Sequence, residues 1–237
     1  MPLIYVCTND ESLTPLQKKR KALEKLLVRY DVSVKVKQDS WLMWFISKLL
    51  FFNPGFMTKF ITAVGSTIYF PKGFIDDDIT FCYVVPHELV HILDMKKRPW
   101  WVILYLMPQI LGVFSLLSLF SFFNEWNLLW LFFLLFILPV PSYWRKKIEM
   151  RGYAMNMAVG EWENGSLSKH YLDEPPTSIV SYFMDASYYF MWPYKKSVKQ
   201  ELQEWLDIIH KDVLNEHIPV AKEIKEIFKG DGNAYRS

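Results

Sequence analysis

Hydrophobic and polar positions follow two different periods in the first part of the chain. Residues 14–30 repeat leucines at helical spacing with basic residues between them, which predicts an amphipathic helix. Thr14 followed by Pro15 is typical of a helix start. Residues 32–37 (VSVKVK) alternate between apolar and polar side chains and therefore predict a half-exposed strand.

Two apolar segments follow this strand. Residues 41–52 are apolar on nearly every side but too short to span a bilayer. For the apolar residues around 41–60 a core position covering the sheet is favoured, and the alternative is a membrane-facing groove. Residues 60–74 are rich in β-branched and aromatic side chains and predict a strand. Gly65 lies within it and indicates a bulge or a close backbone approach.

The later part of the chain has mainly helical patterns. One helix is predicted to contain residues 81–96, with Pro86 as its start or a kink. Helices are also predicted over residues 144–160 and 197–215, with a loop over residues 161–177 between them. Together with the two strands, this order predicts an α+β fold.

Residues 100–138 differ from the rest in their lack of charge. Trp100 to Phe123 and Trp126 to Tyr143 contain no charged residue, and Glu125 is the acidic residue between them. Basic clusters lie just outside both ends, at residues 96–98 and 145–147. A membrane hairpin with cytoplasmic ends would have this pattern. The alternative is a hairpin buried in a soluble core.

The pattern divides the chain into a main domain and an insert. Residues 1–99 and 142–237 are expected to form the main domain, and residues 100–141 the hydrophobic hairpin insert. Net charge is only +2, which gives no argument for a nucleic-acid partner. Cys7 and Cys82 have no second cysteine at ligand spacing, so a cysteine-rich zinc site is not expected. The first residues lack the pattern of a secretory signal.

The most informative string is His87-Glu88-Leu89-Val90-His91. Histidines four residues apart lie on one helix face a single turn apart, so both imidazoles can reach one metal ion. Zinc (Zn²⁺) accepts neutral imidazole nitrogen, and Glu88 would lie beside it to take a proton from an activated water. The alternative is a pair of core histidines with Glu88 on a solvated face.

A catalytic zinc site needs a third protein ligand, and Glu149 is the best candidate. His91 lies just before the hairpin and Glu149 just after it, so the two helices become neighbours if the hairpin ends emerge together. Asp94 is the rival, expected to orient a histidine rather than to bind metal. His170 and His210 are further rivals without a spacing argument. Tyr153, one turn beyond Glu149, is the first candidate for an oxyanion donor, ahead of three weaker ones. These are His170, Tyr188 and Tyr189.

This combination resembles the gluzincins, zinc metallopeptidases whose third ligand is a glutamate. Two hydrophobic segments between the HExxH helix and Glu149 are similar to the membrane-bound M48 peptidases, the heat-shock and CAAX-processing group. The resemblance covers roughly residues 60–155. It implies a zincin-like domain, with residues 60–71 as an edge strand along the cleft, zinc held by His87, His91 and Glu149, and Glu88 as general base.

The sequence therefore leads to a hypothesis of function. We expect a membrane-associated zinc metallopeptidase that cleaves a peptide or protein substrate, with its site on the cytoplasmic side and lipid as a partner. One alternative is a catalytically silent zincin-like protein, a structural or partner-binding component of a membrane or a virion. Another is a soluble hydrolase with a buried hairpin.

Overall fold

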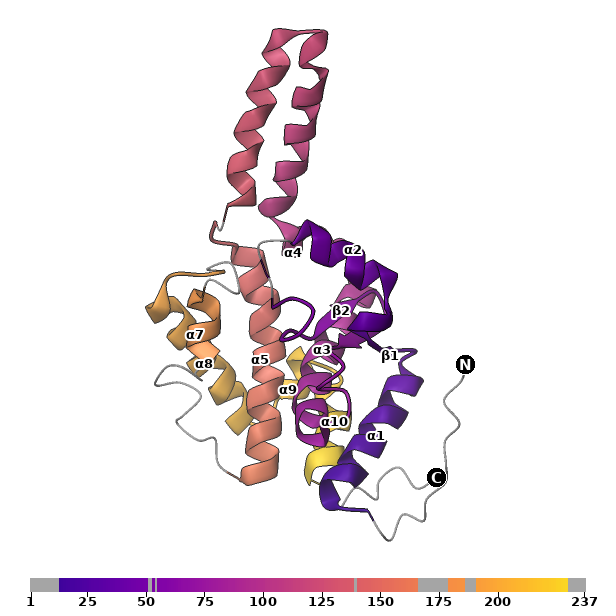
Figure 1. Cartoon of the computed structure of the whole chain (residues 1–237). Coiled ribbons are helices and arrows are strands. Elements are labelled where there is room, and N and C mark those ends of the chain that lie inside the picture. The colour runs from indigo at the N-terminus through magenta and orange to yellow at the C-terminus, as the bar shows by residue number, and fades with distance from the viewer. Residues whose placement is uncertain are drawn as a thin grey trace.

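A computed structural model describes residues 13–50, 53, 55–138, 140–165, 179–185 and 191–229. These residues are mostly helical, with a small mixed sheet, which confirms the predicted α+β class (Figure 1). The elements, in order, are α1 (Pro15–Arg29), β1 (Ser33–Val36), η2 (Lys37–Asp39), α2 (Trp41–Leu49), β2 (Thr62–Val64), β3 (Thr67–Phe70), α3 (Asp78–Lys97), α4 (Trp101–Leu106), η3 (Gln109–Phe122), η4 (Glu125–Ile137), α5 (Tyr143–Asn164), α7 (Ile179–Met184), α8 (Lys195–His210), α9 (Leu214–His217) and α10 (Ala221–Lys229).

The first helix begins where the sequence predicts. The Thr14 side chain accepts a hydrogen bond from the Gln17 backbone N–H, and the Gln17 side chain accepts one from the Thr14 N–H. This reciprocal capping satisfies N–H groups that a helix start otherwise leaves without a partner. The leucine face of α1 is buried against α3.

The sheet has the strand order β1-β3-β2. Strand β1 runs parallel to β3, and β2 runs antiparallel to it. The prediction of one strand over residues 60–74 is wrong, because Gly65 adopts a φ of +60° in a tight turn between β2 and β3. A backbone in this region favours glycine, so Gly65 permits a hairpin rather than a bulge. Strand β2 is left at the edge of the sheet.

Helix α2 buries only part of its surface. Met43 packs with Phe56 and Tyr69, so one face covers the sheet. The opposite face exposes its largest side chains, Trp41 and Trp44 among them. The core position favoured from the sequence therefore holds for one face only.

Helices α3 and α5 lie side by side at the centre of the molecule (Figure 1). Helix α3 continues through Pro86 and begins at Asp78, so Pro86 does not mark its start. Helix α5 continues past Gly160 to Asn164, beyond its predicted end. The main core gathers side chains from these two helices and from α1, α8 and α10. Residues 166–177 of the predicted loop, and the last eight residues, lie outside the described residues.

The uncharged segment forms a hairpin that projects from the helical body, drawn at the top of Figure 1. Its arms, η3 and η4, are in the 3₁₀ conformation and lie against each other. The first apolar stretch is divided at Pro108, which has no N–H for a helical hydrogen bond and separates α4 from η3. Within the described parts of the chain, no helix combines the length and the apolar character needed to cross a membrane.

A buried ion pair fixes α5 against α8. The Lys146 ammonium lies 2.7 Å from Glu201 Oε2, and the Lys147 ammonium lies 2.8 Å from Glu201 Oε1. Lys146 and Glu201 are both buried. Buried charges require such pairing because desolvation of an unpaired charge is costly.

Candidate metal centre

Three side chains from the two central helices converge at one point. His87 and His91 extend from successive turns of α3, and Glu149 extends from the facing turn of α5. The two Nε2 atoms are 3.0 Å apart, and Glu149 Oε2 lies 3.5 Å from the first and 3.6 Å from the second. All three residues are buried. They form a His-His-Glu group able to hold a metal ion.

The spacing of these atoms matches a tetrahedral ion. Ligand atoms about 2.1 Å from a tetrahedral zinc ion lie roughly 3.4 Å from one another. The three measured separations, 3.0, 3.5 and 3.6 Å, bracket that value. The donor set also suits zinc, which accepts imidazole nitrogen and carboxylate oxygen.

Gly152 explains how the two helices come close enough to share a site. A Cβ atom at this position of α5 would lie 2.6 Å from both Cε1 and Nε2 of His87. The imidazole therefore occupies the space that any other residue's side chain would fill. The sequence signal was present, because Gly152 follows Glu149 by three residues on the same helix face.

Glu149 and His91 shift each other's pKa values through charge and hydrogen bonding. Burial alone would raise the pKa of Glu149, but the charge of His91 and hydrogen bonds from both imidazoles outweigh it and hold this pKa well below its usual range. Burial would lower the pKa of His91, but Glu149 outweighs this effect and raises it. Glu149 is therefore ionised, as a metal ligand must be.

Glu88 lies on α3 between the two histidines and is not one of the three converging side chains. No hydrogen bond joins its carboxylate to another side chain in the described residues. Burial raises the pKa of Glu88 more than the charges of His87 and His91 lower it; repulsion from Glu149 raises this pKa further, and Lys37 lowers it slightly. A half-buried carboxylate with a raised pKa is a suitable proton acceptor.

Lys37 is a buried cation that no sequence pattern marks as a site residue. Its ammonium donates hydrogen bonds to the Phe56 carbonyl at 2.8 Å and to Thr62 Oγ1 at 2.7 Å. Burial lowers the pKa of Lys37 to about 8. Its hydrogen bond to Thr62 connects the end of β1 to the edge strand β2. Its positive charge also lowers the pKa of Glu88 slightly.

Tyr153, the expected oxyanion donor, is buried. Its ring packs edge-on against His87 with 4.9 Å between ring centroids, and it stacks on Tyr182. This contact places Tyr153 beside one histidine of the His-His-Glu group. Its catalytic role remains a prediction.

The rival ligands are not part of the group. Both Asp94 oxygens accept hydrogen bonds from Arg151, at 2.6 and 2.9 Å. The expectation that Asp94 orients a histidine is therefore corrected, because its carboxylate is bound to the guanidinium instead. His210 is exposed at the end of α8. His170, Tyr188 and Tyr189 lie outside the described residues.

Tyr105 is a site residue that sequence reasoning missed. It lies on α4, at the root of the hairpin, and its hydroxyl donates to Glu149 Oε1 at 2.7 Å. Burial and the charge of Glu149 raise the pKa of Tyr105 well above 10.0. The hydroxyl is therefore a neutral donor. No motif marks it, since the sequence around it has only the apolar pattern of the hairpin.

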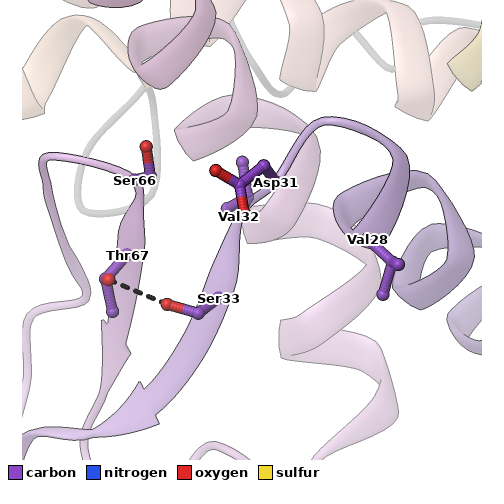
Figure 2. A pocket seen from close by; sticks show the side chains of 6 residues that line it. All are labelled: Val28, Asp31, Val32, Ser33, Ser66 and Thr67. Atoms are coloured by element: carbon purple, nitrogen blue, oxygen red, sulfur yellow. Dashed lines mark hydrogen bonds between the residues drawn. The ribbon is translucent and has the colours of Figure 1, made fainter.

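A surface pocket lies elsewhere, between the end of α1 and the sheet (Figure 2). Ser33 and Thr67 face each other across β1 and β3 and share a hydrogen bond of 2.8 Å between their hydroxyls. The other residues that line the pocket are Val28, Asp31, Val32 and Ser66. The pocket contains none of the residues of the candidate metal centre.

Fold and site together define an α+β protein with a buried His-His-Glu group. Comparison of the chain with protein-family models, with curated proteins and with solved structures gave no match.

Proposed function

We propose that this protein is a zinc-dependent metallopeptidase of the gluzincin type. The observation that supports the proposal best is the convergence of His87, His91 and Glu149, with Glu88 beside them and outside the ligand set. Structural zinc sites usually have four protein ligands, whereas catalytic sites have three and keep a position open. The described residues bring three potential ligands together, which favours catalysis.

The residues of the chain have separate roles in this proposal. His87, His91 and Glu149 hold the ion, which when bound supplies a positive charge that polarises a carbonyl and acidifies water. Glu88 accepts the proton of the attacking water and returns it to the leaving amine. Tyr153 is the proposed donor to the developing oxyanion.

A peptide substrate is supported by the position of β2. This strand contacts α3, which bears both histidines, and within the described residues it pairs with β3 alone. Its outer edge therefore offers backbone N–H and C=O groups to an extended segment. Strand addition at a sheet edge is a common way to bind peptides.

Metal analysis and peptide hydrolysis test this function together. Purified protein dialysed against zinc should hold about one equivalent and cleave members of a peptide library. His87→Ala should lose both properties, because one of three ligands is removed. His210→Ala is the matched control, since His210 is exposed and is not one of the three converging residues. Wild-type protein that binds no zinc would disprove the metal site. Zinc binding without cleavage would favour the structural alternative.

We propose in addition that the hairpin holds the protein at a membrane. Its side chains are apolar and exposed, with Phe122 at the tip 96% exposed and Leu129 on η4 67% exposed. Soluble monomers rarely expose contiguous apolar patches of this kind. Lipid is therefore the proposed partner of the hairpin.

The root of the hairpin has the side chains expected at a membrane surface. Trp100, Tyr143 and Trp144 are exposed there. Aromatic rings of this kind are enriched at the level of lipid headgroups. The basic residues of 96–98 and 145–147 flank the hairpin, and such residues are enriched on the cytoplasmic side of membranes. We therefore propose that the candidate metal centre faces the cytoplasm.

An arginine in the hairpin tests the lipid contact. Leu129→Arg should weaken flotation with lipid vesicles by roughly 100-fold, because an arginine in hydrocarbon costs about 3 kcal/mol. Val28→Arg is the control, since Val28 is equally exposed, at 71%, but lies on α1 in the body. Wild-type protein that stays out of the vesicle fraction, or equal flotation of both variants, would contradict the proposal.

A further inference from the structure

We propose that Tyr105 is a positioning residue for the metal ligand Glu149, an inference that rests on the metal site proposed above. The hydroxyl of Tyr105 is 2.7 Å from Glu149 Oε1. The other carboxylate oxygen, Oε2, is the one that faces both imidazoles. Each oxygen of Glu149 thus has a separate partner.

This division fixes the orientation of the carboxylate. The last torsion of a glutamate side chain has a broad preference and does not by itself select one orientation. A hydrogen bond to Oε1 removes that freedom and directs Oε2 at the two Nε2 atoms. The ligand group is then arranged before a metal arrives, which lowers the entropic cost of binding.

Tyr105 also supports the ligand set from outside, because its hydroxyl donates a hydrogen bond to Glu149 and is not itself one of the three converging groups. Metal-binding histidines usually donate their second nitrogen to a carboxylate or carbonyl group. The Nδ1 atoms of His87 and His91 are buried, and neither has a hydrogen-bond partner among the residues that the structure describes. Within the described residues, the hydrogen bond that holds a ligand of this group from outside is therefore the one from Tyr105 to Glu149.

Contacts at the hairpin root hold Tyr105 in place. The Arg145 guanidinium donates to the Tyr105 carbonyl at 3.2 Å and lies 5.2 Å from the centroid of its ring. The same guanidinium donates to Gln109 Oε1 at 3.2 Å, at the start of η3. Ser142 donates to the Met107 carbonyl, which joins the returning chain to the segment after α4. The orientation of Glu149 is thereby linked to the root of the insert.

Zinc affinity of Tyr105→Phe, measured by competition with a chromophoric chelator, tests the inference. Loss of an outer-shell hydrogen bond weakens metal binding by roughly 10–100-fold, and we expect a loss in that range. The absorption spectrum of the cobalt-substituted protein should change as well, because the coordination of Glu149 changes. Tyr143→Phe is the control, since Tyr143 is exposed near the same root.

The outcomes separate the inference from the metal site itself. If wild-type protein binds no zinc, the metal site is disproved. If wild-type protein binds zinc and Tyr105→Phe binds it equally well with the same cobalt spectrum, the positioning role is overturned. Melting of the metal-free proteins shows whether the variant folds. If it does not, Tyr105→Gln and Tyr105→Leu replace it, since they are similar in size and only Gln can donate. Tighter zinc binding by the Gln variant supports the role, and equal binding overturns it.

Discussion

Glu88→Gln is expected to reduce peptide hydrolysis by roughly 10²–10⁴-fold, the usual contribution of a general base. Glutamine has nearly the same shape as glutamate but cannot accept the proton of the attacking water. Glu88 is not one of the three converging ligands, so zinc content should stay at the wild-type level. Single-turnover cleavage rates and metal analysis on the same samples measure both effects.

Glu216→Gln provides the control for this change, because Glu216 is an exposed carboxylate near the C-terminal end of the described chain. It should leave hydrolysis unchanged. A Glu88→Gln variant that cleaves at the wild-type rate would remove the general-base role. A variant that loses zinc together with activity would mean that Glu88 holds the site together rather than moving a proton.

Gly152→Ala is expected to reduce zinc affinity by more than about 100-fold. The added methyl group would lie 2.6 Å from His87 Nε2, closer than non-bonded atoms approach. Either the imidazole turns away or α5 moves back from α3. Both responses exceed the roughly 0.5 Å within which a metal-binding group must be held.

The same substitution should not weaken the helix itself. Alanine is favoured over glycine inside a helix by about 1 kcal/mol. Circular dichroism should therefore show a folded protein, while chelator competition shows the lost affinity. Gly73→Ala serves as the control, because a Cβ there has no atom within 4 Å. If Gly152→Ala binds zinc normally, His87 does not occupy the place assigned to it.

Local signals in the sequence were enough to predict several structural features. Thr14, Pro15 and Gln17 define the start of α1 through contacts within one helical turn. The two histidines of α3 share a face because they are four residues apart on a helix. Glu149 could be selected because an insert that leaves and returns at one place brings its flanking helices together.

Other features depend on which helix faces which, and no local pattern contains that information. The bond from Tyr105 to Glu149 requires α4 to be folded back on α5. Asp94 has the right spacing to assist a histidine, but Arg151 on α5 binds both of its oxygens. The turn at Gly65 could not be predicted from a local pattern either, since a glycine between β-branched residues is compatible with a bulge and with a hairpin turn.

The sequence predicted that a distant glutamate reaches the two histidines, and Glu149 lies 3.5 and 3.6 Å from their Nε2 atoms. The small residue at Gly152 adds a reason for that approach, since it leaves room for the His87 ring. The substrate and the reaction remain proposals, for which the Glu88 experiment is the most direct test.

The double ion pair of Glu201 has a consequence for the precision of the site. Two consecutive residues of α5, Lys146 and Lys147, hold the same carboxylate, so α5 is restrained against rolling about its own axis. A side-chain tip about 6 Å from a helix axis moves roughly 1 Å for each 10° of such rotation. Glu149 lies about one turn further along α5, so the direction of its side chain depends on the rotation of this helix. The two ion pairs with Glu201 on α8 therefore restrain the rotation of α5 that would turn Glu149 away from the two histidines.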